Sequence, residues 1–375
     1  MRSAPKFIPA LSGIRAIAAI TVVLSHSASS GFLPKMFLDG AASVGVMLFF
    51  SLSGFLMAYL YLWRPVSGES IVEYSAARIG RVYPLFAVVI LFCCAMHYLD
   101  NRFAYDLDVA YAVQHLLLFG DTNTIWTIAT EFYFYGLFIP IWVWCSSRSP
   151  SKTTFRLLAV VALLVFLLWL MGFPGGRIAI TRYLHFFLLG MIAAAAHRHI
   201  RGVSLANWAL PVSLVIYVLT LPEVLYWAFG LKHPGYGVLP AVLMASIVFF
   251  TAKSGPASKT SRVLGARPMV YIGELSFGLY LLHRPAMSVW RGILAYTGWE
   301  FPPMVLFICL VISLWVASHL ANRLIEVPAR RFINERSKTE RSLLRPSPVD
   351  AGSNQEAANC ELSIPGEEAE VARLQ

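Results

Sequence analysis

Two ionisable residues, Arg15 and His26, lie eleven positions apart within one apolar stretch of the sequence. In an α-helix this spacing returns to within about 20° of the same face after three turns, about 16.5 Å further along the axis. An arginine can hold an anion, and a histidine can accept or donate a proton near neutral pH. The pair therefore predicts a helix face with an anion-binding end and a proton-transfer end. The alternatives are a snorkelling interfacial arginine and a packed histidine.

A second arginine pair, Arg78 and Arg81, occurs in the segment ARIGRVYPL. Residues three apart are neighbours on one helix face, and two guanidinium groups can hold a phosphate through paired hydrogen bonds. The pair predicts a phosphate site at the cytoplasmic entrance of a membrane span. The alternative is simple anchoring by positive charges on that side of the membrane.

Glu131 and His283 also lie within apolar stretches, in IWTIATEFYFY and GELSFGLYLLHRP. A charged side chain near the middle of a membrane helix costs roughly 2.5–3.5 kcal/mol, so each is a functional candidate. Glu131 lies about 9 Å below the outer boundary by helix rise. The alternatives are a helix–helix partner for an arginine such as Arg182, and a structural polar bridge at His283. Glu326 and Arg330 close the last apolar stretch, where they predict a local salt bridge as readily as a catalytic role.

The composition determines which elements position these residues. The chain has 375 residues, of which 58% are hydrophobic and 13% charged, and its mean hydropathy is +0.65. Soluble domains carry roughly 25% charged residues, so a water-soluble globular protein is excluded. We predict an all-α, polytopic helical bundle in a lipid bilayer. About ten apolar stretches are long enough to cross it: 9–28, 41–63, 80–99, 125–145, 156–173, 179–197, 207–226, 236–252, 269–290 and 303–325.

The distribution of Lys and Arg predicts the orientation. One set of alternate loops carries fourteen of these residues, and the other carries five: Lys35, Arg102, Arg177, Lys232 and Arg291. Because cytoplasmic loops carry the excess, both termini are predicted to be cytoplasmic. The same rule accounts for the net charge of +10, so no nucleic-acid partner is predicted. The apolar segment 109–119 is too short to cross and is expected to be interfacial or re-entrant.

The chain divides into a transmembrane domain over 1–335 and a tail over 336–375. The tail is rich in Ser, Glu, Pro and Arg and has no aromatic residue, which predicts a disordered cytoplasmic segment. The first apolar stretch is too long for a signal-peptide core and is expected to be retained as a helix. The five cysteines have no CxxC spacing, so neither a disulfide framework nor a metal site is predicted.

Taken together, the candidates predict a site with two ends. Arg15, Arg78 and Arg81 gather on the cytoplasmic side, where they suit an anionic ligand. His26, Glu131 and His283 gather in the outer half, where a carboxylate can orient a histidine that acts as a general base. A long donor that enters from the cytoplasm could span the two ends.

Six segments in order along residues 7–332 resemble acyltransferase family 3, a family of integral membrane acyltransferases. They are IPALSGIRAIAAITVVLSH, GVMLFFSLSGFLM, ARIGRVYPLF, IWTIATEFYFYG, GELSFGLYLLHRP and EVPARRF. Each segment alone is weak, but six in order on a chain with ten predicted helices are specific. In three places the sequence departs from the pattern: Ser12 stands where an acidic residue is common, Glu131 is followed by Phe132 rather than by a second acid, and Leu282 and Arg284 stand where tryptophans are common. An atypical acceptor pocket is therefore expected.

The resemblance implies transfer of an acyl group, usually acetyl, from cytoplasmic acyl-CoA to a hydroxyl of a cell-surface glycan or lipid-linked oligosaccharide. By motif match, His26 and Glu131 are predicted as catalytic residues. Arg15, Arg78, Arg81 and His283 are predicted to bind substrate, the Arg78–Arg81 pair holding the acyl-CoA phosphates. No bound cofactor or metal is implied. The expected location is a bacterial cytoplasmic (inner) membrane, where polysaccharide-assembly proteins are possible partners.

Three alternatives remain open from the sequence. The acceptor could be a small secondary metabolite such as a macrolide. The chain could be a transporter or flippase of a glycan or anion, although no internal repeat of the kind common in transporters is visible. It could also be a non-catalytic assembly protein of a surface-polysaccharide system, in which the intramembrane histidines and glutamate would be dispensable.

Overall fold

The structure is a computed structural model that describes residues 6–34, 38–100, 105, 107–122, 124–200, 202, 204–255 and 258–344. Every regular element in these ranges is helical. The helices of the first half are α1 (Pro9–Ser29), α2 (Ala42–Met57), η2 (Ala58–Leu62), α3 (Gly68–Asp100), α4 (Val109–Leu116), α5 (Trp126–Cys145) and α6 (Pro150–Leu170). Those of the second half are η4 (Ile180–Arg182), α7 (Leu184–His199), α8 (Ser204–Leu219), α9 (Pro222–Phe229), α10 (Val238–Lys253), α11 (Lys259–Leu264), α12 (Arg267–Glu274), α13 (Ser276–Thr297), α14 (Pro303–Ala321), η5 (Asn322–Glu326) and α15 (Val327–Leu344).

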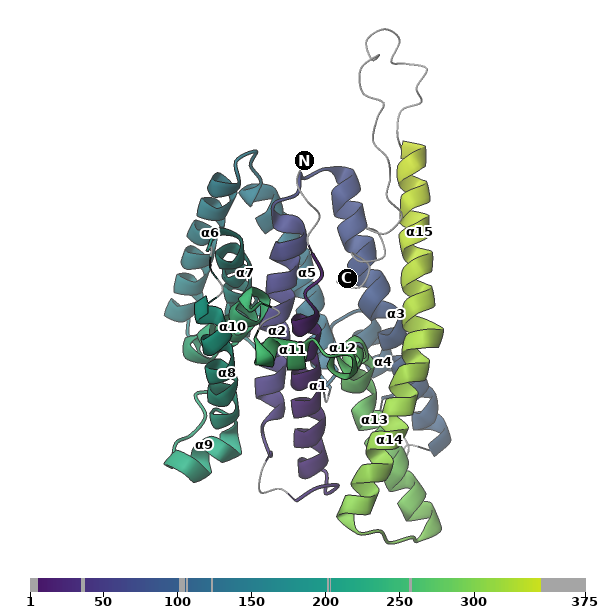
Figure 1. Ribbon diagram of the computed structural model, residues 1–375. Coiled ribbons are helices and arrows are strands. Elements are labelled where there is room, and N and C mark those ends of the chain that lie inside the picture. Colours follow the sequence, from purple (N-terminus) through teal and green to yellow (C-terminus); the bar gives the residue numbers. More distant parts are fainter. Residues whose placement is uncertain are drawn as a thin grey trace.

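The helices form three neighbouring groups (Figure 1). Helices α1, α2 and α5 lie in the middle, α6 to α10 lie on one side, and α3 with α12 to α15 lies on the other. Helix α2 packs against α1 and α7, and α13 packs against α1 and α14. The central helices are therefore covered on both sides, which explains why α1 and α2 are largely buried.

Within the described ranges, six helices are long and apolar enough to cross a membrane: α1, α2 with η2, α3, α5, α6, and α14 with α15. A seventh span arises if α8 and α9, bent by 83° at their junction, count as one. The apolar helical fold agrees with the predicted helical membrane protein. Each predicted stretch overlaps a helix, but α7 and α10 have only 16 residues each. The number ten and the cytoplasmic location of the termini therefore stay predictions.

Helices α2 and α7 approach each other at two glycines. A Cβ atom on Gly54 would lie 2.0 Å from the carbonyl oxygen of Phe187, and one on Gly190 would lie 2.0 Å from that of Ser51. No larger residue fits either position without moving a backbone, as is common where membrane helices pack through small residues. This contact fixes α2, whose residue Ser53 faces the candidate site described below.

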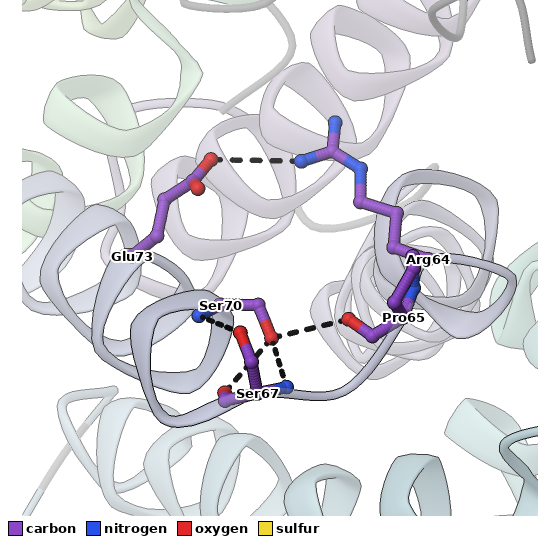
Figure 2. Close-up of polar contacts among 5 residues, drawn as sticks. All are labelled: Arg64, Pro65, Ser67, Ser70 and Glu73. Atoms are coloured by element: carbon purple, nitrogen blue, oxygen red, sulfur yellow. Dashed lines mark hydrogen bonds and ion pairs between the residues drawn. The ribbon is translucent and has the colours of Figure 1, made fainter. Parts of the chain in front are cut away.

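Helix α3 begins at Gly68, twelve residues before the predicted span. Figure 2 shows the polar contacts at its start. The Ser67 hydroxyl accepts from the backbone N–H of Ser70 at 3.1 Å, and the Ser70 hydroxyl accepts from the N–H of Ser67 at 2.8 Å. An ion pair joins Arg64 to Glu73 at 3.5 Å. These reciprocal bonds satisfy N–H groups that a helix start leaves unpaired, so a polar segment outside the apolar stretch is also helical.

Four of the loops predicted to be cytoplasmic are joined by hydrogen bonds on the side of the molecule at which α3 begins. The Trp142 indole N–H donates to the Arg64 carbonyl at 3.2 Å, and Thr154 hydrogen-bonds His199 at 2.7 Å. Lys253 donates to the His197 carbonyl at 3.0 Å. The alternation of loops predicted from charge therefore agrees with the fold, and the assignment of this end to the cytoplasm remains a prediction from charge.

Two segments that were predicted to lie outside the membrane spans can be compared with the structure. Helix α4 has eight residues and rises about 12 Å, far less than a hydrocarbon core of about 30 Å. It matches the predicted non-spanning segment 109–119. Helix α15 continues to Leu344, nine residues beyond the predicted boundary at 335. The rest of the predicted tail, 345–375, lies outside the described residues.

Candidate functional site

A pocket between α1, α2, α3, α5 and α13 holds four of the six predicted site residues: Arg15, Arg78, Arg81 and Glu131. Its empty volume is about 720 Å³. We call it the arginine pocket. The three arginines come from α1 and α3, far apart in the sequence, and the fold brings them to one cavity as the sequence predicted.

Arg78 is the deepest of these arginines, with 3% of its surface exposed. Its guanidinium lies between the rings of Tyr61 and Tyr135, at 5.9 and 6.0 Å from their centroids. Among the described residues, its Nε and Nη2 atoms have no hydrogen-bond partner. Buried charges and N–H groups without partners are costly, so these atoms mark a place for an anion with acceptor oxygens.

Glu131 is held by two hydroxyl groups. Ser53 donates to its Oε1 at 2.7 Å, and Tyr135 donates to the same oxygen at 2.5 Å. Neither predicted histidine is a hydrogen-bond partner of Glu131 in the described structure, so the carboxylate belongs with the arginine pocket rather than with His26. The alternative partner is not used either, since the Arg182 guanidinium lies 5.7 Å from the centre of the Tyr236 ring.

The two histidines meet each other instead. The Nδ1 atom of His26 lies 2.9 Å from the Nε2 atom of His283. The ring planes differ by only 7°, and the centroids are 4.9 Å apart. Two nearly parallel planes that contain atoms 2.9 Å apart cannot be stacked at van der Waals distance. The rings therefore lie nearly side by side, as an N–H···N hydrogen bond requires.

The hydrogen bonds define which nitrogen carries a proton in the neutral pair. The Nδ1 atom of His283 lies 2.5 Å from the Tyr280 carbonyl oxygen, which can only accept. His283 therefore carries its proton on Nδ1, and its Nε2 accepts from the Nδ1–H of His26. This leaves the Nε2 atom of His26 unprotonated. Since His283 is fully buried and His26 is partly exposed, the free lone pair belongs to the more accessible ring.

Tyr280 connects the histidine pair to the arginine pocket. Its ring lies 5.9 Å from that of His283, and its side chain forms part of the pocket wall. The Tyr280 hydroxyl donates to the Thr124 carbonyl at 2.8 Å and hydrogen-bonds Thr127 at 2.7 Å. The two ends predicted for the site are therefore adjacent through one aromatic side chain.

Sequence reasoning missed several side chains of the site. Tyr135 follows Glu131 by four residues and so shares its helix face, which is a usable signal. Tyr280 lies in the segment LYLLH but received no role. Ser53 is one serine in an apolar run and gave no signal. Glu326, for which the sequence left a local salt bridge with Arg330 and a catalytic role equally open, is 8% exposed and interacts electrostatically with Arg81 as well as Arg330.

Comparison with known proteins gives one family match. The acyltransferase 3 model, described as an acyltransferase domain, matches residues 8–321. The chain is 24% identical to peptidoglycan O-acetyltransferase OatA of Listeria monocytogenes, over 89% of this chain and 58% of that protein. It is 24% identical to acyltransferase MdmB of Streptomyces mycarofaciens (88% and 93%) and to O-acetyltransferase OatA of Staphylococcus aureus (87% and 58%). It thus spans little more than half of the OatA proteins. No solved structure matches the chain.

Proposed function

Because the chain belongs to the acyltransferase 3 family, we propose that this membrane O-acyltransferase transfers an acetyl group from cytoplasmic acetyl-CoA to a hydroxyl of a cell-surface or lipid-linked glycan. The observation that carries the proposal is the adjacency of an anion-binding pocket and a histidine with a free Nε2 atom. The first suits the phosphates of a CoA thioester, and the second suits activation of a hydroxyl.

On the donor side, Arg15, Arg78 and Arg81 bind the CoA phosphates. Arg78 is suited to this because its Nε and Nη2 atoms await acceptors, and a guanidinium fork matches phosphate oxygens. Tyr280 forms part of the wall of the arginine pocket, and its ring lies 5.9 Å from that of His283, so the acyl end of a donor that extends along this wall would reach the histidine pair.

On the acceptor side, His26 acts through Nε2. It takes the proton of the acceptor hydroxyl as the oxygen attacks the thioester carbonyl, and the CoA thiolate leaves. The Nδ1–H of His26 stays bonded to His283, so the imidazolium that forms is held in place by the same hydrogen bond. The same lone pair could instead attack the thioester carbonyl, which releases the CoA thiolate and forms an acyl-histidine; hydrolysis of that intermediate by water would then turn over the donor without acceptor.

The acceptor class follows from the relatives' names, two of which are O-acetyltransferases and one of which acts on peptidoglycan. We propose a glycan for this chain on that ground. The positive charge of alternate loops and the bacterial sources of the relatives support a location in a bacterial cytoplasmic membrane.

The test compares surface glycans from cells with the intact gene, a deletion, and His26→Ala at equal membrane abundance. Mass spectrometry measures base-labile groups of ~42 Da, the mass added when an O-acetyl ester forms through the hydroxyl acylation described above. We expect the group to be lost from both the deletion and the variant. Retention in His26→Ala would contradict the role of the histidine, and retention in the deletion would contradict the proposed acceptor.

A further inference from the structure

A second group of arginines lies at the opposite end of α1 from the arginine pocket. The Nη1 atom of Arg284 donates to the Ser30 hydroxyl at 3.2 Å, and the Nη2 atom of Arg291 donates to the Ser30 carbonyl at 2.9 Å. Ser30 follows His26 by one helical turn and lies about 22 Å along the axis from Arg15. Two guanidinium groups therefore converge beside the catalytic histidine, away from the donor phosphates.

Arg177 completes this group, which we call the outer arginine cluster (Arg177, Arg284 and Arg291). Its guanidinium lies 5.8 Å from the centre of the Trp126 ring. Arg177 and Arg284 both interact electrostatically with the His26 ring. Arg284 also interacts electrostatically with Arg177 and Arg291. Within the described part of the chain, none of the three forms an ion pair with a carboxylate.

Capping of α1 explains only part of this arrangement. Cations stabilise a helix C-terminus, and Arg291 fills that role at the Ser30 carbonyl. The hydrogen bonds to Ser30 use one of the five N–H donors of Arg284 and one of those of Arg291. The Nε atom of Arg284 is buried and has no partner among the described residues. Like charges repel one another, and no carboxylate of the described residues pairs with these three arginines, so the cluster suits an anionic ligand.

We infer that the acceptor is acidic, and that the outer arginine cluster holds its carboxylate or phosphate group beside His26 while the hydroxyl is acylated. The inference rests on the proposed function and names the acceptor's chemical class. The donor and the acceptor are then bound by separate groups of arginines, one near each end of α1. Acceptor binding then depends on Arg284 and Arg291, and donor binding does not.

A phospholipid headgroup offers the same phosphate chemistry, but the contacts favour the acceptor. Arg284 follows the buried His283 directly and bonds to α1 within the helix contact. Arg177 packs on Trp126, a core residue that is 6% exposed. The cluster thus lies beside the catalytic histidine, whereas a site for bulk lipid does not need to be close to a catalytic residue.

The experiment uses the purified full chain in phosphatidylcholine nanodiscs with radiolabelled acetyl-CoA. Acceptor glycans from the deletion strain are separated by anion exchange into neutral and acidic pools. The double variant Arg284→Gln with Arg291→Gln is compared with Lys232→Gln, which removes an exposed positive charge from a loop predicted to lie on the same side.

We expect label in the acidic pool and a KM for that pool about tenfold higher in the double variant, equivalent to about 1.4 kcal/mol. The KM for acetyl-CoA should stay within about twofold, and Lys232→Gln should resemble the parent, because the donor phosphates lie more than a Debye length from the outer arginine cluster. Raising salt from ~50 to ~500 mM should raise the acceptor KM of the parent and not that of the double variant.

Label confined to the neutral pool would overturn the inference alone. An effect of the double variant that appears only when phosphatidylglycerol replaces phosphatidylcholine would assign the cluster to lipid and overturn it as well. If neither pool is labelled and no acetyl-CoA is consumed, the proposed function itself fails and the inference falls with it.

Discussion

His26 on α1 and His283 on α13 are joined by a 2.9 Å contact although 257 residues separate them in the chain. The contact does more than place two histidines together. Through the Tyr280 carbonyl it determines which ring nitrogen is protonated, so the reactivity of His26 depends on a residue that need not touch either substrate.

His283 should therefore affect turnover more than binding. In His283→Ala, His26 loses the acceptor that keeps its proton on Nδ1, and kcat should fall by roughly 100-fold while the KM for acyl-CoA changes little. In His283→Gln the amide oxygen can accept the same bond, and part of the activity should return. The measurement is steady-state kinetics at equal membrane abundance, with His233→Gln as a control. Equal loss in the Ala and Gln variants would argue against a positioning role.

Arg78 should govern donor affinity. In Arg78→Lys the charge remains but the planar fork is lost, so the Kd of CoA should rise about tenfold, or about 1.4 kcal/mol. Equilibrium binding to the purified protein measures this. Arg64→Lys is the matched control, because Arg64 lies on the same side of the bundle but pairs with Glu73. Unchanged CoA affinity in Arg78→Lys would place the phosphates elsewhere.

Glu131 should oppose donor binding electrostatically while contributing to turnover. Glu131→Gln removes the carboxylate charge from a pocket with three arginines and keeps an oxygen that Ser53 and Tyr135 can reach. The KM for acyl-CoA should therefore fall by a few-fold, with a steeper dependence on salt, and kcat should fall as well. A rise in the KM for acyl-CoA would show that the Glu131 carboxylate helps to bind the donor rather than offsetting the charge of the arginines.

The α2–α7 contact should be intolerant of a single methyl group. Gly54→Ala places a Cβ atom against the Phe187 carbonyl, and the backbone shift should cost about 1–3 kcal/mol. Gly136→Ala on α5 is the control, since a Cβ atom there meets nothing within 4 Å and alanine favours a helix by about 1 kcal/mol. Thermal denaturation in one detergent should give a lower midpoint for the first variant and an equal or higher one for the second.

The predicted orientation can be checked with two exposed positions at opposite ends. A membrane-impermeant thiol reagent added to intact cells should label Lys232→Cys above the parent background and should label Lys152→Cys only after the cells are opened. Both side chains are exposed, so accessibility differs through the membrane alone. The reverse labelling pattern would invert the topology derived from the loop charges.

The sequence predicted the positions of the apolar helices well because about 20 apolar residues are a direct signature of a membrane span. It missed the first twelve residues of α3, since hydropathy does not detect a polar helix that is stabilised by the Ser67–Ser70 capping bonds. The predicted spans 179–197 and 236–252 correspond to α7 and α10, which have 16 residues each, so their crossing of the membrane stays a prediction. An apolar stretch in a hydropathy profile also includes flanking residues that are not helical, so it can be longer than the helix itself.

The sequence predicted which residues belong to the site, but only partly which of them contact one another. Arg15, Arg78 and Arg81 were expected together and line one pocket. Glu131 was expected beside His26 because counting residues along α5 gives depth, but depth alone does not determine which neighbour a side chain faces. The contact between His26 and His283 depends on how α1 packs on α13, which no local pattern in either helix encodes.

The histidine contact also has a consequence for biosynthesis. The chain emerges from the ribosome N-terminus first, at about 5–20 residues per second, so His283 follows His26 by roughly 13–50 s. During that interval α1 and α3, which carry the arginines, can already be in the membrane while His26 still lacks its partner. A chain that stalls before α13 thus has part of the arginine pocket, but its His26 lacks the hydrogen bond to His283 that orients it as a base. We therefore expect no hydrolysis of acyl-CoA before α13 has been made, and donor turnover by chains truncated before Ser276 tests this.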